Sequence, residues 1–206
     1  MKTFKIIASV LVIIVALAWL QRAIRSKPLD AEALPPTGMG QVLAEEAAKA
    51  LPKGGQVVLV SMSGGTAEDQ AKLEGFNRTL GKQGKIKVIA TKEFKLNEVG
   101  MGDGRIKFEQ FAAVVNEHSN ADVIVSFLGV NSFTEAQMAS LPKPCPQFVV
   151  ANWKPEDVRR GMNAGLVKAA VMNRVLRSLP TDDPKTPIQW FDRYYDLVTP
   201  DLNRRP

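Results

Sequence analysis

The chain has 206 residues, which is room for one globular domain and a further N-terminal segment. Hydrophobic residues make up 45% of the sequence and charged residues 23%, so intrinsic disorder is not expected. The net charge is +6, but no basic run interleaved with aromatic residues follows the basic N-terminal region, so we expect no nucleic-acid partner. Cys145 is the only cysteine, which excludes an intramolecular disulfide and a multi-cysteine metal site.

The N-terminal segment contains an apolar run, IIASVLVIIVALAWL, at residues 6–20. A run of about 15 apolar residues is just short for a bilayer span and long for a signal-peptide core. Trp19 at its far end suits an interfacial anchor, so we predict an uncleaved signal anchor or transmembrane helix over residues 1–25. A cleaved signal peptide and a buried core helix remain alternatives.

An anchor of this kind would make the chain a single-pass protein of a bacterial cytoplasmic membrane. Basic residues flank both ends of the apolar run, so the charge rule does not settle its orientation. Export of the large C-terminal part to the periplasmic or extracellular side is a working assumption. Residues 26–39, SKPLDAEALPPTGM, contain three prolines and no hydrophobic period, and we interpret them as a linker.

The domain is predicted to occupy residues 40–206, where helix and strand patterns alternate. A helix is expected at residues 41–51, followed by a nearly continuously apolar strand at 56–62. Thr66 and Asp69 form a capping-box-like pair, which opens a second helix that ends near residues 81–84. A second strand follows at residues 86–91.

The second half of the domain continues the alternation after a long connection at residues 92–104. We expect, in chain order, a helix at 105–119, a strand at 122–128, a short helix capped by Ser132 and Glu135, a strand at 147–151 and a helix at 155–164. Gly165 is the expected helix stop, and residues 168–172 read as a fifth strand or as a continuation of the helix.

This order predicts a three-layer α/β fold with a mostly parallel sheet of about five strands flanked by helices. Ligands of such sheets bind at the carboxyl ends of the strands, so the loops at 63–66, 129–132, 152–153 and 173–174 are the first to search. The sequence has no phosphate-binding glycine motif and no nucleophile elbow, and His118 is its only histidine. We therefore expect no catalysis, no cofactor and no metal.

The order of these pieces resembles the type 1 periplasmic binding proteins of the sugar-binding kind, and more specifically their second lobe. The similar stretches are GQVLAEEAAKALPKGGQVVLV at 40–60, EGF at 74–76, NADVIVSF at 120–127, GMNAGLVKAAV at 161–171 and FDRYYDLVTPDLN at 191–203. The resemblance favours the strand interpretation of residues 168–172. It implies a solute-binding domain that holds sugar hydroxyls with polar side chains at the strand ends.

Carried over position by position, the resemblance implies that the family's acidic residue after the fourth strand is replaced by Asn152. The candidate ligand-binding residues are Ser63, Lys72 (with Gln70 as an alternative), Asn131, Asn152, Trp153 and Asn173. Amide groups both donate and accept hydrogen bonds, and Trp153 could stack on a sugar face. The replacement of a carboxylate by Asn152 is a departure that puts sugar binding in doubt.

A second departure is the absence of a first lobe, because the family clamps its ligand between two lobes. A single lobe offers an open surface unless two chains pair or a protein of the cell envelope completes the site. We therefore consider two hypotheses. The first is a membrane-anchored solute-binding domain for a sugar or a similar small polar molecule. The second is a non-catalytic interaction module of an envelope complex that has lost ligand binding.

Overall fold

A computed structural model describes residues 34–100, 104–174 and 184–200 of the chain. The chain divides into two compact units, Met1–Ala31 and Glu32–Pro206, and all described residues belong to the second unit. The predicted anchor at residues 1–25 lies outside the described residues, and so does the predicted linker up to residue 33. In the described ranges, no helix is both long enough and apolar enough to cross a membrane.

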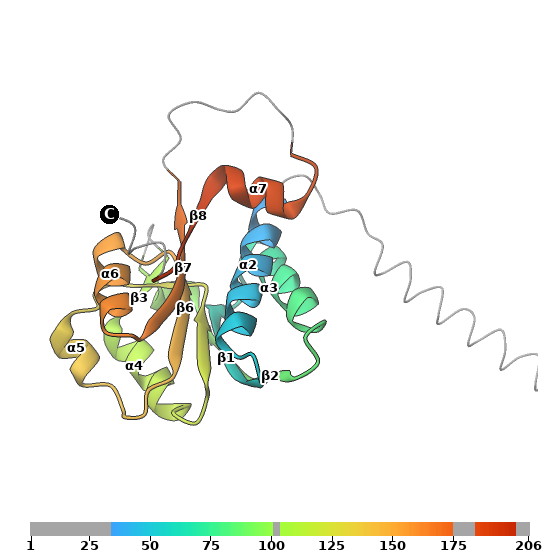
Figure 1. Cartoon of the computed structure of the whole chain (residues 1–206). Coiled ribbons are helices and arrows are strands. Elements are labelled where there is room, and N and C mark those ends of the chain that lie inside the picture. The colour runs from blue at the N-terminus through green and yellow to red at the C-terminus, as the bar shows by residue number, and fades with distance from the viewer. Residues whose placement is uncertain (1–33, 101–103, 175–183, 201–206) are drawn as a thin grey trace, which may run out of the picture. The chain divides into compact units, whose positions relative to one another are not determined.

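The second unit is built on a six-stranded sheet in the order β2-β1-β4-β6-β7-β8 (Figure 1). Its strands are β1 (Gly55–Met62), β2 (Ile86–Phe94), β4 (Val123–Ser126), β6 (Gln147–Ala151), β7 (Val167–Asn173) and β8 (Tyr195–Val198). The first five are parallel, and β8 pairs with β7 in the antiparallel direction. The expected mostly parallel α/β sheet is confirmed, with six strands instead of about five.

Helices cover both faces of the sheet (Figure 1). One face carries α2 (Leu34–Ala50), α3 (Ala67–Leu80) and α7 (Pro187–Tyr194), and the other carries α4 (Phe108–Glu117), α5 (Glu135–Ala139) and α6 (Pro155–Asn163). A short 3-10 helix, η2 (Leu96–Glu98), follows β2, and β3 (Arg105–Ile106) pairs with β5 (Gly129–Val130) in a small second sheet.

The side chains of the central strands alternate between two hydrophobic cores. In β1, Val57 and Leu59 belong to the core under α2 and α3, whereas Val58 and Val60 belong to the core under α4 and α6. All four are at most 2% exposed. A strand buried on both faces has no polar face, which is why the sequence of β1 is nearly continuously apolar.

The first helix begins earlier than the sequence suggested. α2 starts at Leu34, so residues 34–39 are helical and the predicted linker is wrong for them. Pro35 and Pro36 are tolerated because the N–H groups of a first helical turn have no partner within the helix, so a proline there loses no hydrogen bond. Met39 is only 2% exposed, so this turn belongs to the core.

Several other boundaries also differ from the prediction. Residues 105 and 106 form β3, and the helix predicted from residue 105 starts at Phe108. The short helix α5 is capped by Thr134 and Gln137 instead of Ser132 and Glu135. The strand interpretation of residues 168–172 is correct, because Gly165 turns the chain with a φ of +75° and β7 follows.

Candidate functional site

The sequence-predicted residues, apart from Lys72, lie at or next to the carboxyl ends of parallel strands. Ser63 follows β1, Asn131 follows β5, Asn152 follows β6 and Asn173 ends β7. Parallel strands bring their carboxyl ends to one edge of the sheet, so the fold places Ser63, Asn152 and Asn173 along a common edge. We call this the carboxyl edge. Asn131 follows β5 of the small second sheet instead.

Asn152 holds three strand ends together. Its φ of +62° lies in the left-handed region, which Asn tolerates better than most residues. Its side-chain Nδ2 donates to the Phe127 carbonyl at 3.2 Å, and its backbone N–H donates to the Val171 carbonyl at 3.4 Å. These bonds connect the end of β6 with β7 and with the turn after β4, so the amide group has an internal structural role.

The prediction that Trp153 stacks on a ligand is wrong, because the indole lies inside the core. Trp153 is 3% exposed, and its Nε1 donates to the Leu128 carbonyl at 3.3 Å. Its ring centroid lies 4.8 Å from that of Phe133 and 5.5 Å from that of Phe111, in edge-to-face geometry. An aromatic residue that directly follows a buried strand can close the core as well as face a ligand, and here it closes the core.

Lys72 lies on α3 and is paired with an acidic residue of the same helix. Its Nζ lies 3.0 Å from Asp69 Oδ1, and its side chain is 14% exposed. Burial alone would raise the pKa of Asp69, but the Lys72 ammonium and the hydrogen bonds from Lys72 and Thr66 outweigh burial and hold that pKa below its usual range. The alternative candidate, Gln70, is exposed.

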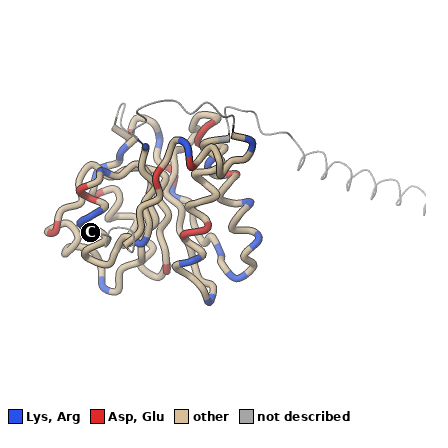
Figure 2. The backbone as a smooth tube through the Cα atoms, turned by 45° about the horizontal axis from the view of Figure 1, so that its top comes forward, with Lys and Arg blue, Asp and Glu red and all other residues tan. Residues whose placement is uncertain are grey.

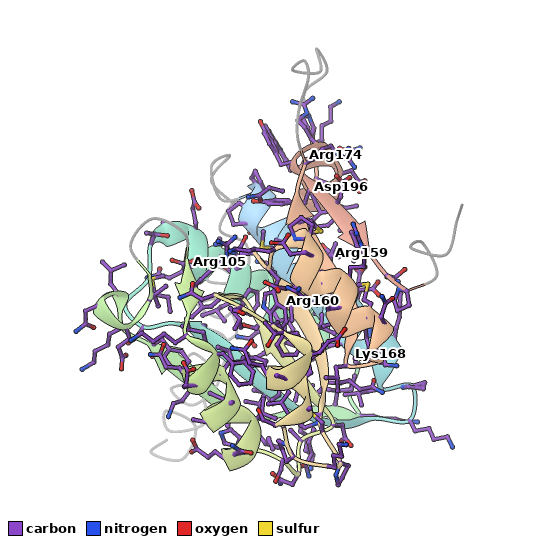
Figure 3. The ribbon with its side chains drawn as sticks, turned by 90° about the vertical axis from the view of Figure 1, so that its left-hand side faces the viewer. Arg105, Arg159, Arg160, Lys168, Arg174 and Asp196 are labelled. Carbon is purple, nitrogen blue, oxygen red and sulfur yellow. The ribbon has the colours of Figure 1, made fainter. Side chains whose placement is uncertain are left out.

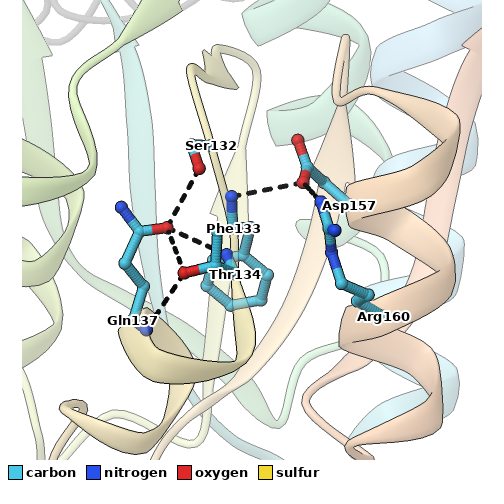
Figure 4. Close-up of polar contacts among 6 residues, drawn as sticks. All are labelled: Ser132, Phe133, Thr134, Gln137, Asp157 and Arg160. Atoms are coloured by element: carbon cyan, nitrogen blue, oxygen red, sulfur yellow. Dashed lines mark hydrogen bonds and ion pairs between the residues drawn. The ribbon is translucent and has the colours of Figure 1, made fainter.

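The segment that carries Asn131 is fixed by two polar networks on either side of Phe133 (Figure 4). Gln137 Oε1 accepts hydrogen bonds from Ser132 Oγ at 3.1 Å and from the Thr134 N–H at 2.8 Å. Asp157, only 2% exposed, accepts from the Phe133 N–H at 3.2 Å and from Arg160. Asn131 itself is exposed, and Ser63 is half-buried at the carboxyl edge.

A hollow of about 340 Å³ lies beside Asn173 at the carboxyl edge. It is lined by Pro35, Pro36, Glu68, Asn173, Arg174, Tyr194 and Tyr195. These residues come from the first turns of α2 and α3, the end of β7 and the junction of α7 with β8. The hollow therefore combines an amide, a carboxylate, a guanidinium and two aromatic rings, the kinds of group that orient a polar ligand.

One wall of this hollow is held rigidly. The backbone of Asn173 faces Tyr195 in the β7–β8 pairing, and the Arg174 N–H donates to the Tyr194 carbonyl at 2.8 Å. Arg174 Nη2 lies 2.6 Å from Asp196 Oδ1, and Figure 3 shows these two side chains together at one end of the molecule. Burial, with smaller contributions from Glu68 and Tyr194, raises the pKa of Tyr195, so its hydroxyl stays protonated at neutral pH.

Glu68, Arg174, Tyr194 and Tyr195 were not identified as site residues from the sequence. The sequence placed Asn173 and Arg174 in a loop at the carboxyl end of a predicted strand, where ligands of such sheets bind. The stretch FDRYYDLV belonged to the segment that resembles the family's closing segment. Neither pattern showed that α7 and β8 would bring the tyrosines back beside Asn173. That proximity depends on the antiparallel edge strand, which was not predicted.

A second hollow, of about 620 Å³, lies between α5 and α6 and contains none of the predicted residues. Cys145 lines it, and burial raises the pKa of its thiol to about 11, so the thiol is protonated and weakly nucleophilic at neutral pH. Among the described residues, no group of three or more His, Cys, Asp or Glu side chains is placed to hold a metal ion.

Several solved structures with a similar arrangement of helices and strands are sugar-binding proteins. An arabinose-binding protein from Geobacillus stearothermophilus superposes with a TM-score of 0.56 at 17% identity, over 81% of this chain and 61% of its own. A solute-binding protein from Agrobacterium vitis bound to α-D-tagatopyranose gives a TM-score of 0.56 at 15% identity, over 84% of this chain and 58% of its own. The chain has the fold of the type 1 periplasmic sugar-binding proteins.

This periplasmic-binding-protein-like lobe spans about three fifths of the length of the structures it matches. A solute-binding protein from Burkholderia graminis in complex with D-arabinose superposes to a similar extent, with a TM-score of 0.54 at 16% identity over 82% of this chain and 61% of its own. No protein-family model and no curated protein matches the sequence. The similarity to the expected family is thus one of fold.

Proposed function

We propose that the lobe is a membrane-anchored, extracytoplasmic solute-binding domain that recognises a sugar or a similar small polar molecule at the carboxyl edge. The observation that carries this proposal is the hollow of about 340 Å³ beside Asn173. Its volume is near the lower end of the range for small-molecule sites, which suits a single small ligand. The structures with this fold that are named above are an arabinose-binding protein and two solute-binding proteins in complex with D-arabinose or α-D-tagatopyranose.

The chemistry of the hollow suits a polyhydroxylated ligand. Asn173 and Glu68 supply hydrogen-bond acceptors, and the Asn173 amide and the Tyr195 hydroxyl supply donors. Tyr194 and Tyr195 offer ring surface against which the apolar face of a sugar can pack. Ser63 and Asn152 lie along the same edge and, together with Asn131, are proposed as secondary contacts. The Lys72 ammonium is already paired with Asp69, so Lys72 is not proposed as a contact.

The proposed domain organisation keeps the N-terminal anchor and moves one boundary. Residues 1–25 are the proposed membrane anchor, residues 26–33 the linker, and the binding domain starts at Leu34, where α2 begins. A partner that completes the open lobe is part of the proposal, either a second copy of the chain or an envelope protein. No catalytic step is proposed.

The alternative is an interaction module of an envelope complex that binds no small molecule. Two observations favour it: the Asn152 amide is used to join strand ends, and the Trp153 ring is buried. Both positions were expected to contact the ligand, and each has an internal role.

Thermal unfolding of the full chain in detergent, measured against a panel of pentoses, hexoses and related solutes, separates the two functions. A ligand at about 100 times its dissociation constant should add about 2.7 kcal/mol to the stability. Asn173→Ala should abolish the shift that a positive sugar produces, whereas Asn120→Ala, at an exposed position beyond the opposite end of the sheet, should leave it unchanged. A panel that produces no shift supports the interaction module.

A further inference from the structure

The opposite end of the sheet carries a cluster of lysines on two adjoining turns. The turn before β1 and the turn before β2 touch, because the Gly55 N–H donates to the Lys85 carbonyl at 3.2 Å and a Cβ on Gly54 would lie 2.8 Å from Lys85 Cβ. Four exposed lysines stand on these turns and on the first residues of β2: Lys53, Lys82, Lys85 and Lys87. We call them the lysine surface.

The positive charge of the lysine surface is not neutralised locally. Within the described residues, none of its four ammonium groups takes part in an ion pair. A carboxylate near the start of β1, that of Asp122, accepts a hydrogen bond from the Gln56 N–H at 2.8 Å through its Oδ2. Figure 2 shows blue segments at the lower edge of the molecule, where these turns lie.

The residue types indicate the class of partner. The two turns, PKGG at 52–55 and GKQGK at 81–85, contain neither an aromatic residue nor an arginine. A lysine ammonium is a compact, hydrated point charge without the planar fork that recognises single phosphates bidentately. Flexible lysines around glycine turns therefore suit a dense layer of anionic groups better than one bound ligand.

We propose that the lysine surface docks the domain onto an anionic lipid bilayer. Each lysine held near an anionic membrane contributes about 1 kcal/mol, so four can orient a domain that is already tethered. This inference rests on the proposed membrane anchor. It does not depend on which solute the carboxyl edge binds.

Docking through the lysine surface has a consequence for the candidate site. The lysine surface lies at the amino ends of β1 and β2, whereas the hollow beside Asn173 lies at the carboxyl edge. β1 has 8 residues and is about 26 Å long at about 3.3 Å per residue. Docking therefore turns the hollow away from the bilayer, where a solute or partner can reach it.

The test uses the full chain in lipid discs of phosphatidylcholine alone or of phosphatidylcholine and phosphatidylglycerol in equal parts. An amine-reactive reagent labels exposed lysines, and mass spectrometry gives the rate at each position. In the anionic discs we expect several-fold slower labelling of Lys53, Lys82, Lys85 and Lys87, lost at about 1 M salt, where the Debye length falls to about 3 Å. Equal rates in both discs would overturn the proposal.

Matched triple variants provide the control. Lys82→Gln, Lys85→Gln and Lys87→Gln together should make the labelling rate of Lys53 the same in both discs. Lys95→Gln, Lys107→Gln and Lys185→Gln, which remove the same charge from exposed positions outside the two turns, should leave Lys53 protected. Loss of protection in both variants, or protection by a DNA duplex but not by anionic discs, would refute lipid docking. The sugar panel reads out the solute site separately.

Discussion

Asn152 donates its side-chain amide to the carbonyl of Phe127 across 3.2 Å while its own backbone sits at a φ of +62°. One residue therefore combines a left-handed conformation with a hydrogen bond between two strand ends. Glycine adopts the left-handed conformation but cannot make the side-chain hydrogen bond. Alanine cannot make the hydrogen bond either, and it adopts the left-handed conformation only with strain.

This arrangement predicts an order of stability among substitutions at Asn152. Asn152→Gly should lower the free energy of unfolding by about 1 kcal/mol, because only the hydrogen bond is lost. Asn152→Ala should cost about 1 kcal/mol more, since alanine adds left-handed strain. Urea unfolding measures both values. Equal losses in the two variants would show that the backbone strain contributes nothing.

The buried indole of Trp153 predicts a large loss of stability without a change at the carboxyl edge. Trp153→Ala should lower the free energy of unfolding by about 3–5 kcal/mol, the usual range for removing a buried aromatic ring. The half-buried Trp190, stacked on Tyr194 at a centroid distance of 5.7 Å, provides the comparison. Trp190→Ala should cost clearly less in the same urea titration. A smaller loss for Trp153→Ala than for Trp190→Ala would contradict the core assignment.

The hydrogen bonds of Asp157 predict that the stability of the segment around Asn131 depends on α6. Its carboxylate accepts from the Phe133 N–H and from Arg160 and is 2% exposed. Asp157→Ala leaves both donors without this acceptor and should cost about 1–3 kcal/mol in urea unfolding. Asp157→Asn keeps one acceptor oxygen and should recover part of that loss. Glu156→Gln, on the exposed side of the same helix turn, should change little.

Most of the parallel sheet could be predicted from the sequence because local pattern determines it. The strand 147–151 is observed with the predicted bounds, and Thr66 with Asp69 forms the predicted capping box. A strand buried on both faces must be apolar, and a cap must place an acceptor at a fixed spacing. Both are short-range requirements, so they are visible in a single sequence.

The elements that surround the candidate site depend on long-range contacts and were missed for that reason. Leu34 to Met39 looked like a linker because two prolines interrupt it, but Gly38 approaches the Pro187 carbonyl so closely that a Cβ would lie 2.1 Å from it. Contact with α7, which is distant in sequence, makes this turn part of the domain. Trp153 likewise has the same local sequence context whether it faces a ligand or the core.

The close approach of α2 and α3 predicts that two glycines cannot be enlarged. A Cβ on Gly40 would lie 1.9 Å from the Lys72 carbonyl oxygen, and a Cβ on Gly75 would lie 2.3 Å from the Thr37 carbonyl oxygen. Either alanine substitution forces the helices apart and should cost about 1–3 kcal/mol, although alanine favours helix formation. Glu74→Ala, at an exposed position of α3, should cost less than 1 kcal/mol. Thermal unfolding of the three variants compares them directly.

The Asp69–Lys72 pair predicts a defined acid dependence of stability. The pKa of Asp69 is held below its ordinary value of 3.8 in the folded chain, so its contribution is fully present above that value and is lost as the pH falls through the folded pKa. Asp69→Asn should therefore lower the stability at pH 7, and the difference from the original chain should vanish well below pH 3.8. Glu74→Gln, which removes an exposed carboxylate from the same helix, serves as the control. If the Asp69→Asn difference persisted unchanged into strong acid, the charge on Asp69 would not be its source.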